Sequence, residues 1–254
     1  MPVALEYVDK AAETYRANAP HTTVLERDVR DVSGQELLDL AGLKVGELDV
    51  LDGSPPCQGF STAGLREEGW GEEKQYSGRY KQRTDDLFDQ FCRLIDEMQP
   101  KVVVAENVKG LVSGVARGYF KEIYKKLETA GTGYEVSAQL LSARHLGVPQ
   151  KRERVIFVCV RKDLGRQPVF PRPYHNKFVT LREAIHDLPE PELYEASWLR
   201  EGTRTRMAWD YTDVVRDPDG CFRHAYQRLY DKDARYMWFK LAPNKVCPTV
   251  AAKI

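Results

Sequence analysis

The sequence has few cysteines, no long apolar run and no net charge, and each absence excludes a class of protein. Its five cysteines are odd in number and include no CxxC pair, so we predict neither a disulfide framework nor a structural zinc site. No segment approaches eighteen consecutive apolar residues, which argues against a transmembrane helix. The first residues lack a basic region followed by an apolar stretch, so we expect no signal peptide and a reducing, cytoplasmic setting.

The bulk composition indicates an ordinary globular protein. Lysine and arginine number 38 and acidic residues number 38, so the total charge does not point to nucleic acid. A chain of 254 residues that is 42% hydrophobic can form one substantial α/β domain with a smaller appendage.

The first two-thirds of the chain alternate short apolar runs with amphipathic stretches, a pattern typical of a parallel sheet flanked by helices. Ser33 and Glu36 have capping-box spacing, and Thr84 is placed to cap the most strongly periodic helix. We predict strands over residues 3–5, 48–51, 102–105, 134–141 and 155–160, and helices over residues 9–17, 34–40, 84–98 and 119–130.

Two segments interrupt this alternation. Residues 62–83 form a long glycine-rich connection, which indicates either an active-site lid or a surface insertion. After about residue 162 prolines become frequent and helical periodicity weakens, which favours a separate, irregular subdomain. We therefore predict one domain over residues 1–160 and a second over residues 161–254.

Reactive side chains occur near the ends of predicted strands, where open α/β sheets bind ligands. Cys57 lies in a proline-restrained turn after a strand, which would expose its thiol, whereas the other four cysteines read as inert. Glu106 follows a buried strand and is either a functional carboxylate or a simple strand-end charge. Arg152 and Arg154 share one face of an extended segment and could grip a phosphate or a carboxylate, or form a solvated edge.

Three motifs, at residues 53–61 (Gly-Ser-Pro-Pro-Cys-Gln-Gly-Phe-Ser), 106–108 (Glu-Asn-Val) and 150–154 (Gln-Lys-Arg-Glu-Arg), together resemble those of the DNA (cytosine-5)-methyltransferases. They occur in the order and with the separations of that family. The resemblance covers roughly residues 5–160 and continues more weakly to the end. It implies a Rossmann-like, S-adenosylmethionine-dependent sheet with a smaller target-recognition subdomain, of the bacterial or phage restriction–modification type.

The resemblance also implies catalytic roles. Cys57 would add to C6 of a cytosine flipped out of duplex DNA, and Glu106 would hold the N3 edge of the base. Arg152 and Arg154 would orient the base, the backbone and the catalytic carboxylate. Residues 62–83 would be the family's mobile loop, and the family pattern includes no metal.

Six further positions match the family's contacts to S-adenosylmethionine. The acidic residue that holds the ribose hydroxyls corresponds to Glu6, and the aromatic residue beside the adenine corresponds to Tyr7. The remaining matches are Asp28, Val29, Pro56 and Leu87.

The sequence departs from the family pattern at both ends. The glycine-rich first motif should precede Glu6, and the last motifs should follow residues 248–250. We expect either a fragment or one half of a split enzyme whose second subunit supplies the missing pieces.

The region from residue 161 to about 244 corresponds to the family's target-recognition region. We expect most of its aromatic residues to belong to the hydrophobic core of that region. A local excess of basic side chains, nine against two acidic ones over residues 144–177, suits a phosphate backbone. Other hypotheses stay open: an RNA cytosine methyltransferase, an inactive DNA-binding remnant, and an unrelated thiol hydrolase.

Overall fold

A computed structural model of the chain describes residues 2–55, 74–76, 80–82, 86–112, 117–173, 178–187, 222–231 and 246–247. The contacts between residues divide the chain into two compact units. The first comprises residues 1–141 and 153–171 with residue 254, and the second comprises residues 142–152 and 172–253. The proposed boundary at residue 160 between a catalytic and a target-recognition part stays a prediction.

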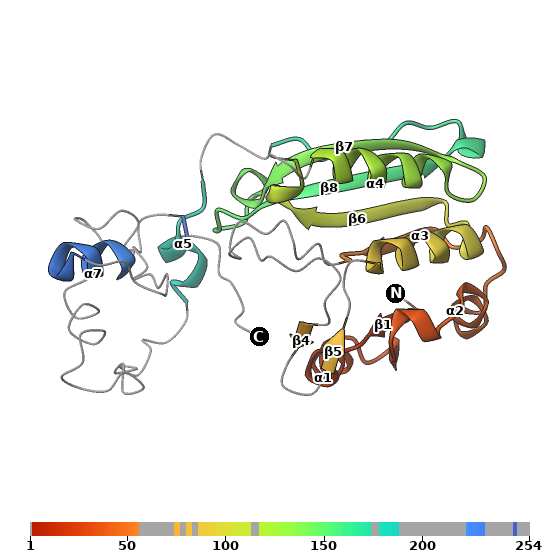
Figure 1. Cartoon of the computed structure of the whole chain (residues 1–254), viewed down its shortest axis with the longest axis horizontal. Coiled ribbons are helices and arrows are strands. Elements are labelled where there is room, and N and C mark those ends of the chain that lie inside the picture. The colour runs from red at the N-terminus through yellow and green to blue at the C-terminus, as the bar shows by residue number, and fades with distance from the viewer. Residues whose placement is uncertain are drawn as a thin grey trace. The chain divides into compact units, whose positions relative to one another are not determined.

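The first unit contains a four-stranded sheet of mixed direction, with the order β3-β6-β8-β7 (Figure 1). Strand β3 pairs parallel with β6, and β6 pairs antiparallel with β8. The bounds of these strands are β3 Val50–Gly53, β6 Val102–Val108, β7 Tyr134–Ser142 and β8 Glu153–Arg161.

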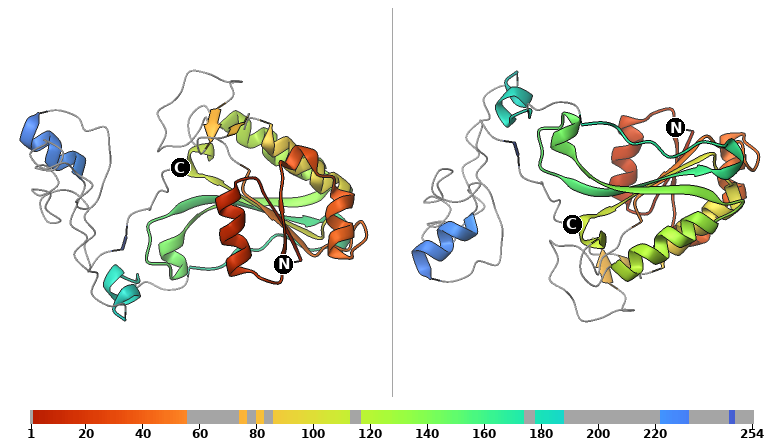
Figure 2. Two further views of the ribbon diagram at one scale, coloured as in Figure 1. Left: turned by 90° about the horizontal axis from the view of Figure 1, so that it is seen from below. Right: turned by 90° about the horizontal axis from the view of Figure 1, so that it is seen from above.

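Two further strands form a separate parallel pair. Strand β1 (Val3–Glu6) is in register with β2 (Thr23–Glu26), and helix α1 (Asp9–Asn18) connects them. Helix α1 lies on the opposite side of the sheet layer from helices α3 (Leu87–Met98) and α4 (Arg117–Thr129) (Figure 2).

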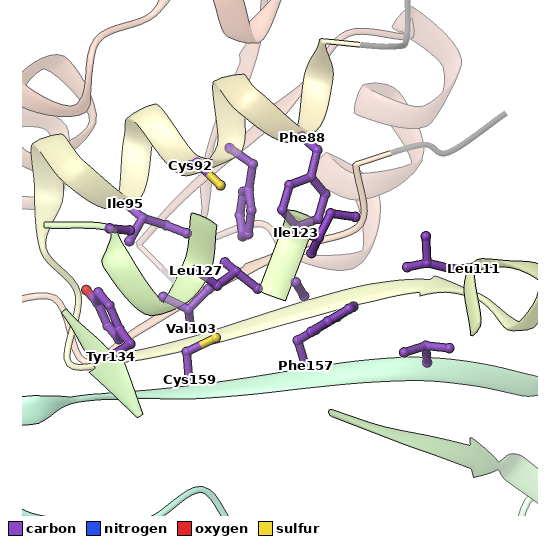
Figure 3. Close-up of a cluster of buried hydrophobic side chains, with 14 residues drawn as sticks. Phe88, Cys92, Ile95, Val103, Leu111, Ile123, Leu127, Tyr134, Phe157 and Cys159 are labelled. Carbon is purple, nitrogen blue, oxygen red and sulfur yellow. The ribbon is translucent and has the colours of Figure 1, made fainter. Parts of the chain in front are cut away.

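The main core forms where α3 and α4 pack on β6 and β8 (Figure 3). Helix α3 has buried side chains over its whole length because its apolar residues recur at helical spacing. On β6, alternate residues Val103, Ala105 and Asn107 are buried, which is the period of a strand with one covered face. The α3–α4 layer therefore fixes the strand that carries Glu106.

The remaining short elements connect these layers. Helix α2 contacts both α3 and β1, and β4 pairs antiparallel with β5. Their bounds are η1 Val29–Asp31, α2 Gly34–Ala41, β4 Lys74–Tyr76, β5 Tyr80–Gln82, η3 Lys109–Val112 and η6 Lys162–Leu164.

The second unit is described in pieces. Helix α5 (Leu181–Ile185) begins with a capping box formed by Thr180 and Glu183, and α7 (Phe222–Tyr230) is a longer helix. Helix η5 (Ala143–Leu146) brings the Arg144 guanidinium 5.1 Å from the centre of the Phe178 ring. Helix α7 corrects the sequence interpretation, which expected no strongly periodic helix here.

Most predicted elements are confirmed, with differences at their ends. The strongest helix begins at Leu87 with Asp86 at its N-cap, so its predicted start at residue 84 was too early. Thr84 itself lies outside the described residues. Strand β2 was not predicted, nor were β4 and β5 within the glycine-rich segment 62–83.

Candidate functional site

Glu106 lies within β6 rather than at its end. The strand continues to Val108, two residues beyond the carboxylate, so the predicted strand end at residue 105 was too early. Glu106 points to the less covered face, and its side chain is 32% exposed. A carboxylate held on a rigid central strand is well positioned to act on a ligand.

Arg154, on the neighbouring strand β8, forms an ion pair with Glu106. Its Nε lies 2.7 Å from Glu106 Oε1, and its Nη1 donates to the Glu153 carbonyl oxygen at 2.8 Å. Two anchors on one planar guanidinium fix the orientation of the carboxylate. The structure therefore brings these two residues into contact, and the catalytic roles assigned to them stay predictions.

Asn107 connects β6 to the segment that precedes Cys57. Its side chain is buried, and its Nδ2 donates to the Pro55 carbonyl oxygen at 3.2 Å. Its Oδ1 accepts from the Val108 amide at 2.9 Å. The end of β3 is thus tied to the residue next to Glu106.

Cys57 and Pro56 lie outside the described residues, as does most of segment 62–83. In the sequence, Cys57 follows Pro55, the last described residue before it, by two positions.

Arg152, the remaining predicted catalytic residue, belongs to the second unit. Its carbonyl oxygen accepts a hydrogen bond from the Ala143 amide at 2.8 Å.

A cavity of about 690 Å³ lies in the first unit beside this site. Four of the six predicted cofactor residues line it: Glu6, Tyr7, Val29 and Leu87. Ser54 and Pro55 also line it, so the cavity reaches the segment that leads to Cys57.

Glu6 stands at the carboxyl end of β1. Its Oε1 accepts hydrogen bonds from the amides of Tyr7 and Val8, both at 2.8 Å. These contacts hold the carboxylate at the cavity wall.

Asp28 does not line the cavity, unlike Val29 beside it. Its carboxylate caps η1 through the Arg30 amide at 3.0 Å and pairs with the Arg30 guanidinium at 2.9 Å. Arg30 also binds Asp86 at the start of α3. Asp28 therefore helps to join η1 to α3, and a direct cofactor contact stays a prediction.

The described cysteines, Cys92, Cys159 and Cys247, are all buried. Burial raises the pKa of Cys92 and that of Cys159 to about 12, and it also raises the pKa of Cys247. These thiols stay protonated at neutral pH, which suits packing and not nucleophilic chemistry.

Within the described ranges, no group of three or more histidine, cysteine or acidic side chains could hold a metal ion. Among the same residues, no helix is both long and apolar enough to cross a membrane.

The sequence analysis gave no site role to Asn107, although it belongs to the Glu-Asn-Val motif, and none to Arg30 or Asp86. A signal existed for Asn107, because it continues the alternation of Val103 and Ala105 on the buried face of β6. No local sequence pattern predicts the contact between Arg30 and Asp86, because the two residues are 56 positions apart.

Comparison with known proteins agrees with the geometry. Residues 1–216 match the family model described as C-5 cytosine-specific DNA methylase. The Type II methyltransferase M.SacI of Streptomyces achromogenes is 34% identical over 220 residues, which is 81% of this chain and 53% of the relative. M.AquIA of Picosynechococcus is 36% identical over 68% of this chain and 67% of its own length.

A crystal structure described as a DNA modification methyltransferase encoded within a prophage (E. coli) shares the fold, with a TM-score of 0.63. It is 20% identical, and the match covers 98% of this chain and 75% of that chain. The chain spans about half the length of several curated relatives it matches. The extent of the family match shows that the chain belongs to the C-5 cytosine-specific DNA methylase family.

Proposed function

We propose that this chain carries the catalytic residues for transfer of a methyl group from S-adenosylmethionine to C5 of a cytosine in duplex DNA. Two contacts carry this proposal: the ion pair of Glu106 with Arg154, and the hydrogen bond from Asn107, next to Glu106, to Pro55. The Glu106–Arg154 ion pair and the Asn107–Pro55 hydrogen bond place an oriented carboxylate beside the segment that leads to Cys57. Family membership supports the same chemistry.

Cytosine C5 is a poor nucleophile, so the base must be activated before it is methylated. In the proposed mechanism the Cys57 thiolate adds to C6 and forms a C–S bond, and the π electrons move to make C5 enamine-like. Glu106 holds the N3 edge of the base and its proton, which makes C6 more electrophilic. After methylation, loss of the C5 proton and of the thiolate restores the aromatic ring.

Arg154 has a positioning role in this proposal. Its anchors on Glu106 and on the Glu153 carbonyl keep the carboxylate in one orientation on β6. We assign Arg152 to orientation of the base or of the DNA backbone, in line with the family motif.

The cavity walls fit S-adenosylmethionine, which supplies the electrophilic methyl group when bound. Glu6 offers a carboxylate for the ribose hydroxyls, and Tyr7 offers an aromatic side chain for the adenine. Val29 and Leu87 add apolar contact, and Asp28 and Pro56 complete the proposed set. Because the cavity reaches Ser54 and Pro55, a cofactor here would lie beside the residues that precede Cys57 in the sequence.

The proposed substrate is duplex DNA, and the target cytosine must leave the stack for Cys57 to reach C6. The basic residues of segment 144–177 and of the proposed target-recognition region, from residue 161 to about 244, would contact the phosphate backbone. Two arrangements are proposed: either the chain acts alone, or a second subunit acts with it as a partner. The proposal also includes a cytoplasmic location, where a catalytic thiol stays reduced.

The test is methyl transfer from tritiated S-adenosylmethionine to a mixed-sequence duplex, with transfer RNA assayed in parallel. We expect label at cytosine C5 in the duplex and its loss with Cys57→Ser, while DNA binding persists. Label on adenine, on the cytosine amino group, or only on transfer RNA would contradict the proposal.

A further inference from the structure

Helix α3 carries two neighbouring stripes of side chains. The apolar stripe lines the cavity and comprises Leu87, Phe91, Leu94 and Met98. Beside it lies a polar stripe, whose members are spaced by seven and four positions and so share one helical face: Asp86, Arg93 and Glu97. Each member of the polar stripe binds a residue of segment 28–34, which contains η1 and the start of α2. The polar stripe therefore attaches this segment to the helix that forms one wall of the cavity.

Arg93 is the centre of the attachment. Its Nη2 donates to the carbonyl oxygens of Val29 at 2.8 Å and of Val32 at 3.0 Å. Its Nε donates to Gln90 Oε1 and its Nη1 donates to Glu97 Oε1, both at 2.8 Å. The guanidinium is planar, so the two contacts within α3 fix the direction in which Nη2 points. The third nitrogen is thereby held where it bridges the two carbonyls.

Glu97 extends the attachment to helix α2. Its Oε1 accepts from Arg93, and its Oε2 accepts from the backbone amide of Gly34, the first residue of α2. Burial acts to raise the pKa of Glu97, but the hydrogen bonds from Gly34 and Arg93 hold that pKa below its usual value. The two helices are also close here, because a Cβ on Gly34 would lie 2.6 Å from Glu97 Cβ. One charged pair thus holds both η1 and the start of α2.

The segment held in this way supplies part of the cavity wall. Val29 lines the cavity, and α2 contributes Leu37, Leu38 and Ala41. Arg93 and Glu97 are not among the lining residues, so they can act on a ligand only through the backbone that they hold. Val32 is 1% exposed, which anchors the far end of η1 in the protein interior.

We propose that Arg93, supported by Glu97, is a positioning residue for S-adenosylmethionine, because it fixes the part of the cavity wall that carries Val29. Hydrogen bonds from a charged donor are stronger than those between neutral groups, which suits them to holding a backbone in one place. A wall that is already in place loses less conformational freedom when a ligand binds, so the affinity is higher. This inference rests on the proposed function, since it concerns the cofactor of that enzyme.

Lysine cannot replace arginine in this role. A lysine side chain ends in a single nitrogen, whereas Arg93 uses three nitrogens for four contacts in one plane. Arg93→Lys therefore keeps the charge and the aliphatic part of the side chain but loses the bridge between the two carbonyls.

Arg161 provides a matched control, because it makes the same kind of contact elsewhere in the first unit. Its Nη1 donates to the carbonyl oxygens of Gly46, at 3.0 Å, and of Gln99, while Asp163 binds its Nε and Nη2. None of these four residues lines the cavity. Arg161→Lys should therefore lower the stability of the fold without altering the wall that Val29 belongs to.

The experiment compares the original chain with Arg93→Lys and Arg161→Lys. Isothermal titration calorimetry measures the Kd for S-adenosylmethionine, and thermal unfolding measures the stability of the ligand-free chain. We expect both variants to melt about 2–4 °C lower, but only Arg93→Lys to raise the Kd, by at least about fivefold. With saturating cofactor, kcat of Arg93→Lys should stay within about twofold of the original, because the Glu106–Arg154 pair on β6 and β8 is untouched.

Glu97→Gln is a second variant, which tests the proposal even if Arg93→Lys does not fold. A glutamine has one acceptor oxygen where glutamate has two, so either Arg93 or the Gly34 amide loses its partner. The Kd should rise by at least about threefold.

The outcomes separate this inference from the proposed function. If the original chain binds S-adenosylmethionine and the Arg93 and Glu97 variants bind it equally well, the positioning role is wrong and the proposed chemistry stands. The same conclusion follows if Arg161→Lys loses as much affinity as Arg93→Lys. No binding by the original chain would overturn the cofactor site itself, and the positioning role with it.

Discussion

At the scale of single residues, the site depends on how neighbouring side chains restrain one another. Glu106 would be one more exposed carboxylate without Arg154, whose Nε lies 2.7 Å from it. The sequence motifs predicted both residues because they follow or begin strands, and the structure places them on adjacent strands. Asn107 received no role, since its contact with Pro55 joins residues 52 positions apart.

Glu106→Gln should lower the rate of methyl transfer by about 10²–10⁴-fold, because the amide cannot carry the proton that the carboxyl group exchanges. The size and position of the side chain are retained, so binding of DNA should change little. The matched control is Glu122→Gln, which removes one of the two acidic partners of Lys126 on α4, outside the site; Glu122 lies 2.9 Å from Lys126, and Asp89 is the other partner. Equal single-turnover rates for the two variants would remove Glu106 from its proposed role.

The buried thiols provide a prediction about pH. Because burial raises the pKa of Cys92 and of Cys159 to about 12, the folded chain retains protons that the unfolded chain releases near pH 9. The free energy of unfolding should therefore fall as pH rises from about 9 to 12, by up to about 1.4 kcal/mol per pH unit for each thiol. Urea unfolding at a series of pH values measures this slope.

Cys159→Ala serves as the control for that measurement, and it should show a shallower decline because one of the two thiols is absent. Iodoacetamide at pH 8.5 should leave Cys92 and Cys159 unmodified in the folded chain. Stability independent of pH, or alkylation as fast as in urea, would show that these thiols are not buried as described.

At the scale of elements, the sequence predicted whether a segment is a helix or a strand better than it predicted the first and last residues. Helical periodicity identified α3 but not its first residue, Leu87; the residue before it, Asp86, makes no capping hydrogen bond with its side chain and pairs with Arg30. Strand β6 is longer than its valine run because pairing with β8 continues to Val108. Strand β2 has only four residues, which are too few to predict a strand from their own pattern, and it forms by pairing with β1.

Gly53 ends β3, and its lack of a side chain allows α3 to pack closely. A Cβ at this position would lie 2.5 Å from Phe91 Cε2, and the Phe91 ring is buried. Gly53→Ala should therefore destabilise the fold by about 1–3 kcal/mol and displace the segment that leads to Cys57. Thermal unfolding and the methyl-transfer rate would both report the change.

Gly118→Ala is the matched substitution in α4, where nothing lies within 4 Å of an added Cβ. It should leave stability unchanged or raise it by up to about 1 kcal/mol, because alanine favours the helix. If Gly53→Ala behaved like Gly118→Ala, close packing of β3 on α3 would not be what requires the glycine.

At the scale of the whole molecule, one cavity in the first unit is proposed to hold the cofactor. The family resemblance implied that Glu6, Tyr7, Val29 and Leu87 serve one site, and these four residues line one cavity. The sequence did not predict which strands pair, since the pairing of β1 with β2 and of β3 with β6 follows from how two sheets are arranged and not from any local pattern.

Glu6→Gln should weaken S-adenosylmethionine binding by about tenfold, because hydrogen bonds to a charged acceptor are stronger than those to an amide. Glu26→Gln is the matched control, since Glu26 is in register with Glu6 on β2 but pairs with Arg16 at 3.1 Å. Isothermal titration calorimetry of both variants measures the difference. Equal affinities would move the cofactor away from this end of β1.

The central claim is that Cys57 forms a covalent bond to cytosine while Glu106 activates the base. The most direct measurement is trapping with duplex DNA that contains 5-fluorocytosine, in the presence of S-adenosylmethionine, because fluorine at C5 blocks the elimination that frees the thiol. The account predicts an adduct that survives denaturation, maps by mass spectrometry to Cys57 and is absent with Cys57→Ser. An adduct at another residue, or none with the original chain, would contradict it.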